Sequence, residues 1–256
     1  MTIFSTFNDK QYQFSGKGLI KSVRKNLPFA GIVTYIDFID ASFSDEWVTP
    51  IRTATLMNVK KVFEANQDVI HKSFGGNADR VSGDEFWNKR WFGWFKKVAM
   101  AHHAICIKNF GEEFGGYLIF VDSDIRIKKP FGEDTLRSLM GGKPIGFMKG
   151  DRPAIDSGFI VIDTNSLKPQ KFYGYFMDLF LSGNFKTHTR WDDGYLMTKL
   201  AEACPEEWFH DFAEGKSANK HTNSNGHATN NQIIPFSELS EYIEHDKGIH
   251  IRNNIL

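Results

Sequence analysis

Hydrophobic residues recur along the chain with two different spacings. Short apolar runs bounded by polar or turn residues predict β-strands, and these runs cover residues 3–7, 31–38, 117–121, 145–149 and 158–162. Longer segments with an apolar residue every three to four positions predict helices at 11–25, 52–66, 86–107, 133–140, 172–181 and 194–203. In the first of these helices the apolar face is formed by Phe14, Leu19, Ile20 and Val23, and Pro28 ends it.

Alternation of predicted strands and helices along the chain indicates an α/β fold. Strands that alternate with helices usually form a largely parallel sheet covered by helices. We find no internal repeat and no interdomain linker, so we expect one domain over residues 1–256. Residues 215–231 are polar and rich in Asn, Ser, Thr and His, which predicts a long or partly disordered loop.

Two aspartates follow the most hydrophobic of the predicted strands. The run 117–121 (Tyr-Leu-Ile-Phe-Val) is typical of a strand buried on both faces, and Asp122 and Asp124 come directly after it. In an extended backbone, positions i and i+2 point the same way, so we expect the two carboxylates to share a face. Ligands of open α/β sheets bind beyond the carboxyl ends of the strands. The pair therefore predicts a divalent-cation site that can hold a phosphate; the alternative is a plain acidic turn.

Composition restricts the partners and the compartment. The formal net charge is zero, so no overall field draws the protein to nucleic acid or to a membrane. Two cysteines, Cys106 and Cys204, lie in or beside predicted helices without metal-type spacing, which suits a reducing compartment. The N-terminus has no basic region followed by an apolar one, and no apolar run is long enough to cross a bilayer. We expect a soluble cytoplasmic protein with no membrane insertion.

Several motifs together resemble those of glycosyltransferases of the GT-A fold, most closely the retaining family 8 and its phage-encoded, DNA-base-modifying relatives. Asp122-Ser123-Asp124 after a hydrophobic strand resembles their Asp-X-Asp signature. Four other segments are similar in order and type: 6–9 (Thr-Phe-Asn-Asp), 154–159 (Ala-Ile-Asp-Ser-Gly-Phe), 191–194 (Trp-Asp-Asp-Gly) and 245–248 (His-Asp-Lys-Gly). The resemblance implies a single GT-A domain with a nucleotide-sugar-binding half at about 1–124. It also implies an acceptor-binding half at about 125–256, which would carry a C-terminal metal and diphosphate segment.

The resemblance also assigns roles to single residues. It implies Mn²⁺ or Mg²⁺ as cofactor, held by Asp122, Asp124 and His245, and an imidazole ligand favours manganese. It implies contacts to the donor from Thr6, Phe7, Asn8, Lys97, Ser123, Lys247, Gly248, His250 and Arg252. Of these, Lys247, His250 and Arg252 would meet the diphosphate. Asp156 and Asp192 or Asp193, with Lys97, are the candidates for holding the donor sugar and orienting the acceptor. Capping of a helix is the alternative for Asp192 and Asp193, and a solvated helix face for Lys97. His102 and His103 are expected to pack or cap structure.

Two segments depart from the family 8 pattern. Residues 248–252 read Gly-Ile-His-Ile-Arg where relatives usually continue to Lys-Pro-Trp, so the basic residue that meets the phosphate is not fixed. The second acidic motif is Asp-Asp-Gly where many relatives have Asp-Gln-Asp. Retention of the anomeric configuration is an implication of the resemblance.

The expected activity is transfer of a sugar from a nucleotide-sugar, by default a UDP-hexose such as UDP-glucose, to an acceptor hydroxyl. The acceptor suggested by phage relatives is a hydroxymethylpyrimidine in DNA, which would place the enzyme in a host cytoplasm. Residues 87–97 mix Lys and Arg with aromatic residues that could meet phosphates and stack on a base, although aromatic residues in a helix are usually core. Glycan-, lipid- and protein-directed transfer remain alternatives. So do a HAD-type phosphatase, in which the first Asp is a nucleophile, and a nucleotide-sugar-binding protein without catalysis.

Overall fold

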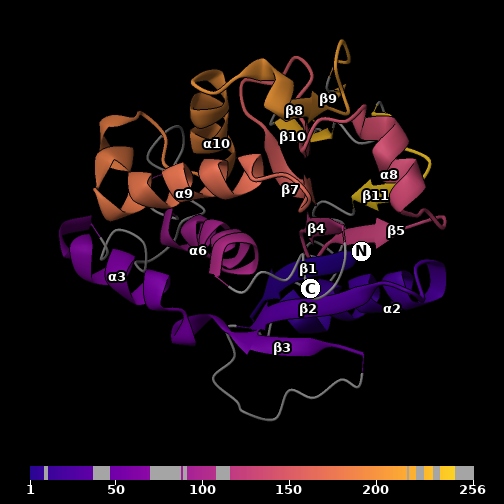
Figure 1. Cartoon of the computed structure of the whole chain (residues 1–256), viewed down its shortest axis with the longest axis horizontal. Helices are drawn as coiled ribbons and strands as arrows, with labels where there is room; N and C mark the ends of the chain where they lie inside the picture. Colours follow the sequence, from indigo (N-terminus) through magenta and orange to yellow (C-terminus); the bar gives the residue numbers. More distant parts are fainter. Residues whose placement is uncertain are drawn as a thin grey trace.

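The computed structural model describes residues 1–8, 11–36, 47–69, 88, 91–107, 116–217, 219–222, 228–232 and 237–245. Its centre is a seven-stranded sheet in the order β3-β2-β1-β4-β7-β6-β8 (Figure 1). The strands are β1 (Thr2–Phe7), β2 (Gly31–Ile36), β3 (Thr49–Arg52), β4 (Tyr117–Val121), β6 (Ile145–Met148), β7 (Asp156–Asp163) and β8 (Phe209–Asp211). β3, β2, β1 and β4 are mutually parallel, β7 is antiparallel to β4 and to β6, and β8 is parallel to β6.

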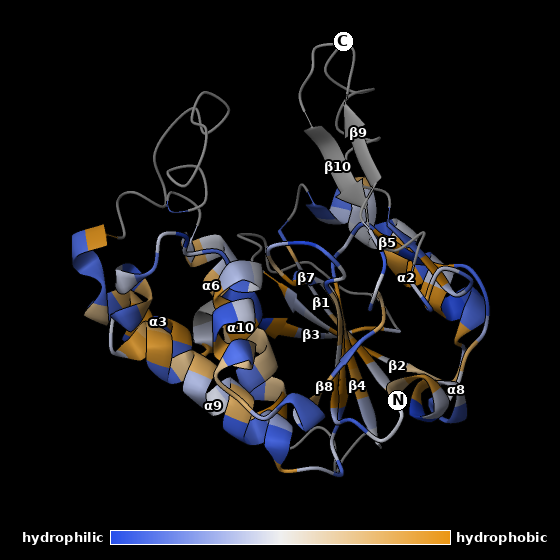
Figure 2. Ribbon diagram, turned by 90° about the horizontal axis from the view of Figure 1, so that it is seen from above, coloured by the Kyte–Doolittle hydropathy of each residue, from blue (hydrophilic) through white to orange (hydrophobic). Residues whose placement is uncertain are grey.

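Helices cover both faces of this sheet. They are η1 (Tyr12–Gly16), α2 (Lys17–Asn26), η2 (Thr53–Thr55), α3 (Met57–Ala65), α6 (Trp91–His102), η4 (His103–Ile107), α8 (Glu133–Met140), α9 (Lys168–Leu181), η5 (Asn184–Thr187), α10 (Asp193–Glu202) and η6 (Glu206–Trp208). Figure 2 shows α3, α6, α9 and α10 on one side of the sheet and α2 and α8 on the other. The sheet is therefore the middle layer of three.

β4 shows why the sheet needs two covering layers. Leu118 and Phe120 belong to the core on the α6–α9 side, whereas Tyr117, Ile119 and Val121 belong to the core on the α2–α8 side. Every residue of this strand is buried, as its unbroken apolar run predicts. Burying a large apolar side chain contributes about 1.5–3 kcal/mol, so β4 is firmly held and its carboxyl end is a rigid support.

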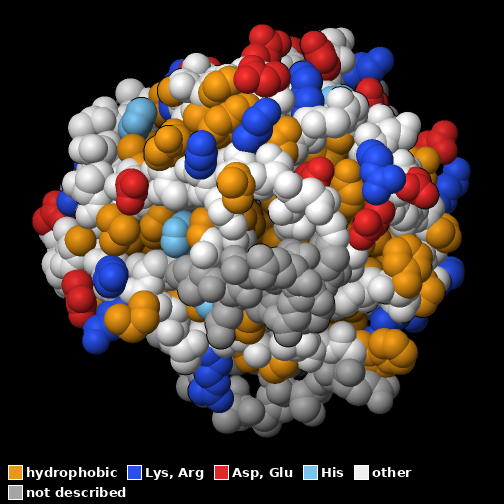
Figure 3. Space-filling model, in the orientation of Figure 1, with side chains coloured by type: hydrophobic (Ala, Val, Ile, Leu, Met, Phe, Trp, Pro, Cys, Tyr) orange, Lys and Arg blue, Asp and Glu red, His pale blue; other side chains and the backbone are white. Residues whose placement is uncertain are grey.

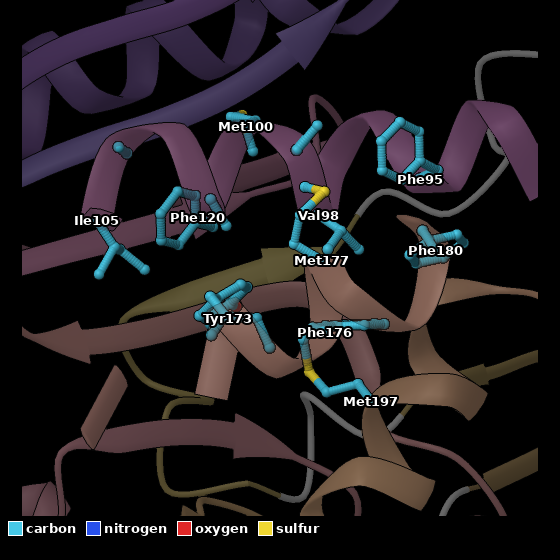
Figure 4. Packing of buried hydrophobic residues seen from close by; sticks show 14 of the residues in the cluster. Phe95, Val98, Met100, Ile105, Phe120, Tyr173, Phe176, Met177, Phe180 and Met197 are labelled. Atoms are coloured by element: carbon cyan, nitrogen blue, oxygen red, sulfur yellow. The ribbon is translucent and has the colours of Figure 1, made fainter. Parts of the chain in front are cut away.

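Aromatic side chains fill the layer between α6 and α9. Phe95 on α6 lies beside Phe180 on α9, with ring centroids 4.9 Å apart, and Phe176 packs one turn away along α9 (Figure 4). The rings of Trp91 and Phe185 also pack together, with their centroids 4.8 Å apart. Trp91, Phe92 and Phe95 are buried core residues, whereas Trp94 is partly exposed.

Two small sheets stand outside the central one. β5 (Ile125–Ile127) pairs with β11 (Ile243–His245) in antiparallel register, with His245 opposite Ile125. β9 (Asn219–Thr222) pairs with β10 (Ala228–Gln232). The expectation of a loop over 215–231 was therefore wrong at these strands. The prediction relied on polar composition, and backbone pairing in an antiparallel ladder does not require apolar side chains.

The predicted α/β class and mixed, mostly parallel sheet are confirmed, and most helices and strands lie where expected. The helix expected at 52–66 starts at Met57, because Thr49–Arg52 joins the sheet as β3. The helix expected at 86–107 is α6 followed by the π-helical turn η4, with 86, 87, 89 and 90 outside the described residues. Within the described part of the chain, no helix combines the length and apolarity needed to cross a bilayer. Acidic and basic side chains are interspersed on the face shown in Figure 3.

Candidate metal and nucleotide-sugar site

The site begins at the turn that follows β4. The Asp122 backbone N–H donates to the Gly158 carbonyl at 2.9 Å, which continues the β4–β7 ladder by one residue. The Ile125 N–H then donates to the Asp122 carbonyl at 3.0 Å and closes a tight turn over Ser123 and Asp124. The extended i, i+2 geometry expected for the two aspartates was therefore wrong. A turn between β4 and β5 brings their carboxylates together instead.

The antiparallel pairing of β5 with β11 brings the distant His245 to this turn. The His245 imidazole is buried, and its Nε2 lies 3.0 Å from Asp124 Oδ1. One ligand atom from each of Asp122, Asp124 and His245 lies within 4.8 Å of the others. The three residues named as metal ligands from the sequence are thus side by side, although 121 positions separate the last two.

Lys97 reaches the same turn from α6. Its ammonium lies 2.8 Å from Asp122 Oδ1, 3.2 Å from Asp193 Oδ2 and 3.1 Å from Ser157 Oγ. Burial alone would lower the pKa of Lys97, but the carboxylates of Asp122 and Asp193 outweigh burial and raise the pKa above its ordinary value. Lys97 is therefore a charged, hydrogen-bonded residue of the site, and the alternative of a solvated helix face is wrong.

The two aspartates of the second acidic motif have different surroundings. Asp192 caps α10, because its Oδ1 accepts from the Tyr195 N–H at 3.1 Å, and its other oxygen pairs with Arg190 at 2.9 Å. Asp193 instead turns toward Lys97 and is only 4% exposed. Burial raises the pKa of Asp193, and the Lys97 ammonium opposes that effect. Of the two, Asp193 is the one that joins the Asp122 side of the site.

Asp156 lies at the start of β7, on the side of Asp122 that faces away from Lys97. It accepts from the Gly158 N–H at 3.1 Å and pairs with the Arg152 guanidinium at 2.6 Å. A Cβ at Gly158 would lie 3.1 Å from Asp122 Oδ2, 3.1 Å from Asp156 Oδ1 and 3.2 Å from His245 Cε1. These side chains therefore surround the space that the missing Gly158 side chain leaves open.

The donor set fits a divalent cation of the manganese or magnesium type. Two carboxylates and one imidazole are oxygen and nitrogen ligands, and the imidazole favours Mn²⁺ over Mg²⁺. A bound divalent ion would add positive charge beside the Asp122 and Asp124 carboxylates.

The opening segment lies next to this turn. Thr6 lines a small cavity together with Lys97 and Asp122. Phe7 is 1% exposed and packs against Tyr12, so its side chain belongs to the core and only its backbone is available to a donor. Asn8 is exposed and caps the first helical turn, since its Oδ1 accepts from the Gln11 N–H at 2.8 Å.

Ser123 is tied to the first helix. Its hydroxyl lies 2.7 Å from the Ser15 hydroxyl on η1. A short hydrogen bond thus joins the turn that carries the two aspartates to the segment expected to hold the nucleotide. Lys247, Gly248, His250 and Arg252 lie outside the described residues.

His102 and His103 pack as expected. The His103 Nδ1 lies 2.9 Å from the buried Tyr35 hydroxyl. The Asn58 side-chain amide lies 3.4 Å from the His102 Nδ1, and burial lowers the pKa of His102. Neither histidine belongs to the cluster of potential metal ligands found in the described residues.

Sequence reasoning missed three polar residues of this site: Ser15, Arg152 and Ser157. Ser157 and Arg152 flank Asp156 in sequence, so proximity to a candidate aspartate was a signal for both. Ser15 gave no comparable signal, because its partner Ser123 is 108 positions away.

Comparison with known proteins supports the fold. No protein-family model matches the chain, and no curated protein matches its sequence. Among solved structures, the apo form of mouse xyloside xylosyltransferase 1 matches with a TM-score of 0.50 and 15% sequence identity, covering 82% of this chain and 85% of that one. This chain has the GT-A fold. At that identity the likeness concerns the fold alone, and within the GT-A fold the acidic turn after β4 forms a potential metal site.

Proposed function

We propose that this chain is a metal-dependent glycosyltransferase that moves a sugar from a nucleotide-sugar to an acceptor hydroxyl. The observation that carries the proposal is the coincidence of a GT-A fold with Asp122, Asp124 and His245 gathered at the carboxyl end of β4. Either feature alone is compatible with other functions, because a fold does not determine an activity and acidic clusters are common. Their combination favours a site for a cation and a nucleoside diphosphate.

Asp122, Asp124 and His245 would hold the cation, Mn²⁺ in preference to Mg²⁺. When bound, such an ion supplies positive charge to the departing diphosphate as a Lewis acid. The turn around Ser123, with Thr6 and Asn8 beside η1, would hold the nucleotide. Lys247, Gly248, His250 and Arg252 remain candidates for contacting the diphosphate on the basis of the sequence.

Asp156 and Asp193 are the candidates for orienting the sugar and the acceptor. They lie on opposite sides of Asp122, since Asp156 faces the space above Gly158 and Asp193 shares Lys97 with Asp122. Each is paired with a cation, Arg152 and Lys97 respectively, which fixes the orientation of its carboxyl group. Carboxyl oxygens in a fixed orientation suit sugar hydroxyl groups as hydrogen-bond acceptors.

We propose a UDP-hexose as the donor. We also propose that the transfer retains the anomeric configuration and that the chain is related to glycosyltransferase family 8. For the acceptor, a glycan hydroxyl is preferred over a hydroxymethylpyrimidine in DNA. Three of the aromatic residues that motivated the DNA hypothesis, Trp91, Phe92 and Phe95, pack in the core. The GT-A fold also disfavours the HAD-type phosphatase alternative.

The test is incubation of the protein with UDP-glucose and a panel of other UDP-hexoses, with and without Mn²⁺. We expect slow release of UDP to water that requires the metal, and faster release once a competent acceptor is added. Release of phosphate from an aryl phosphate without UDP release would favour a phosphatase. Tight binding of UDP-sugars with no release under any condition would favour a binding protein.

The acceptor is tested separately. A glycan array and hydroxymethylpyrimidine DNA are offered in parallel with the donor that releases UDP. Sugar transfer to glycans and none to DNA is the expected result, and the reverse would restore the DNA hypothesis.

A further inference from the structure

The ammonium of Lys97 lies among three polar side chains of the site. It forms ion pairs with Asp122 Oδ1 at 2.8 Å and Asp193 Oδ2 at 3.2 Å, and it donates a hydrogen bond to Ser157 Oγ at 3.1 Å. The acceptors come from the end of β4, from β7 and from the first turn of α10. These contacts direct the ammonium toward side chains of the protein itself, and they join three separate elements of the fold.

We propose that Lys97 is a positioning residue of the metal centre, which holds Asp122 in its metal-facing orientation and fixes the start of α10 to the same turn. This differs from direct contact with the donor, the role that the family resemblance implies. The inference rests on the proposed function in taking Asp122 as a metal ligand.

Asp122 is shared between Lys97 and the metal cluster. Its Oδ1 faces Lys97, whereas its Oδ2 faces the space over Gly158 that His245 also borders. Rotation of the carboxylate would lose the bond to Lys97, so the ammonium fixes the oxygen that looks toward His245. Groups that hold a metal ligand in this way change metal affinity by about 10- to 100-fold when they are removed.

Asp193 depends on Lys97 for its counter-charge. It is 4% exposed and accepts from the Gly194 N–H, and Lys97 is the cation paired with it among the described residues. The Arg190 guanidinium is directed to Asp192 instead. Loss of Lys97 alone would leave Asp193 as a buried carboxylate without a cation, which is a strongly unfavourable state.

The first experiment is a metal titration that needs no donor and no turnover. Lys97→Met/Asp193→Asn removes one positive and one negative charge together, so the net charge around the metal is unchanged. We expect the Kd for Mn²⁺, measured by calorimetry, to rise at least about tenfold in this variant, because Asp122 loses its fixed orientation. Asp193→Asn alone keeps the Lys97–Asp122 bond, and we expect a smaller loss. Lys96→Met, on the same helix with its ammonium over the Phe92 ring, is the matched control and should bind Mn²⁺ like wild type.

The second experiment is a double-mutant cycle on the stability of the metal-free protein. Lys97→Met should lower the urea midpoint, and adding Asp193→Asn should restore most of the loss because the unpaired buried carboxylate is gone. A residue that only contacts the donor would leave the midpoint unchanged and raise the donor KM.

Wild-type Mn²⁺ affinity in the double variant, or a midpoint that falls further in it than in Lys97→Met, would overturn the proposal. Both measurements are independent of glycosyl transfer. If the wild-type protein releases UDP but the double variant binds Mn²⁺ like wild type, the role of Lys97 is refuted and the proposed glycosyltransferase activity stands. If the titration and the cycle give the expected results but no UDP is released, the role of Lys97 stands and the proposed activity is refuted.

Discussion

Replacing Gly158 by Ala tests whether the open space beside Asp122 is needed for metal binding. The backbone allows the change, because Gly158 is not among the described glycines with positive φ. The new Cβ would lie 3.1 Å from Asp122 Oδ2, 3.1 Å from Asp156 Oδ1 and 3.2 Å from His245 Cε1. Ordinary contacts begin at about 3.5 Å, so the neighbours must move by about 0.3–0.4 Å.

That displacement is small for the fold and large for a metal site. Ligand distances in metal sites hold to about 0.2 Å, and two of the three groups that must move belong to proposed metal ligands. We expect Mn²⁺ affinity to fall at least tenfold, equivalent to about 1.4 kcal/mol. We expect the free energy of unfolding of the metal-free protein to change by less than about 1 kcal/mol, since reduced freedom of the unfolded chain offsets part of the strain.

Calorimetric Mn²⁺ titration and urea unfolding of the Gly158→Ala protein measure both quantities. Gly174→Ala on α9 is the matched control, because a Cβ there would meet no atom within 4 Å. The control should bind Mn²⁺ normally and gain about 0.5–1 kcal/mol of stability from its helical position. Wild-type Mn²⁺ affinity in Gly158→Ala would refute the placement of the ion in this space.

Three further predictions concern stability. Phe95→Ala should destabilise the protein by about 3–5 kcal/mol in urea unfolding, because the ring is fully buried; a loss below about 1 kcal/mol would contradict its place in the core. Arg152→Met should cost about 1.5–3 kcal/mol by removing a hydrogen bond between charged groups, and Arg152→Met/Asp156→Asn should recover part of this loss; equal losses in both variants would argue against the ion pair. Burial lowers the pKa of His102, so the folded protein favours the neutral imidazole and loses stability as the pH falls below about 6.5, where the unfolded chain takes up a proton. His102→Gln should flatten the dependence of unfolding free energy on pH in that range by up to about 1.4 kcal/mol per pH unit, and an unchanged slope would show that His102 does not titrate this way.

The central sheet and half of the site were predictable because their signals are local. The apolar run of β4 is buried on both faces, and Asp122 and Asp124 follow it directly. Side chains at the carboxyl ends of strands meet at one edge of a sheet, so a site there could be expected before any coordinates.

The remaining features depend on contacts between distant segments. β5 and β11 have three residues each, too few to show a period, yet their pairing is what brings His245 to Asp124. His245 was named only through the family resemblance, and its spacing from Asp124 carries no local signal. The choice of Asp193 over Asp192 likewise depended on which side chain meets Lys97 across the core.

Anomalous diffraction at the manganese edge, from crystals soaked with Mn²⁺ and UDP, would locate the ion itself. The account predicts one strong peak bounded by the Asp122 and Asp124 carboxylates and the His245 imidazole, and its loss in Asp124→Asn. We also expect metal-dependent UDP release to fall at least about 100-fold in that variant, with an unchanged far-UV circular dichroism spectrum. A peak elsewhere, or none between those three side chains in well-soaked crystals, would contradict it.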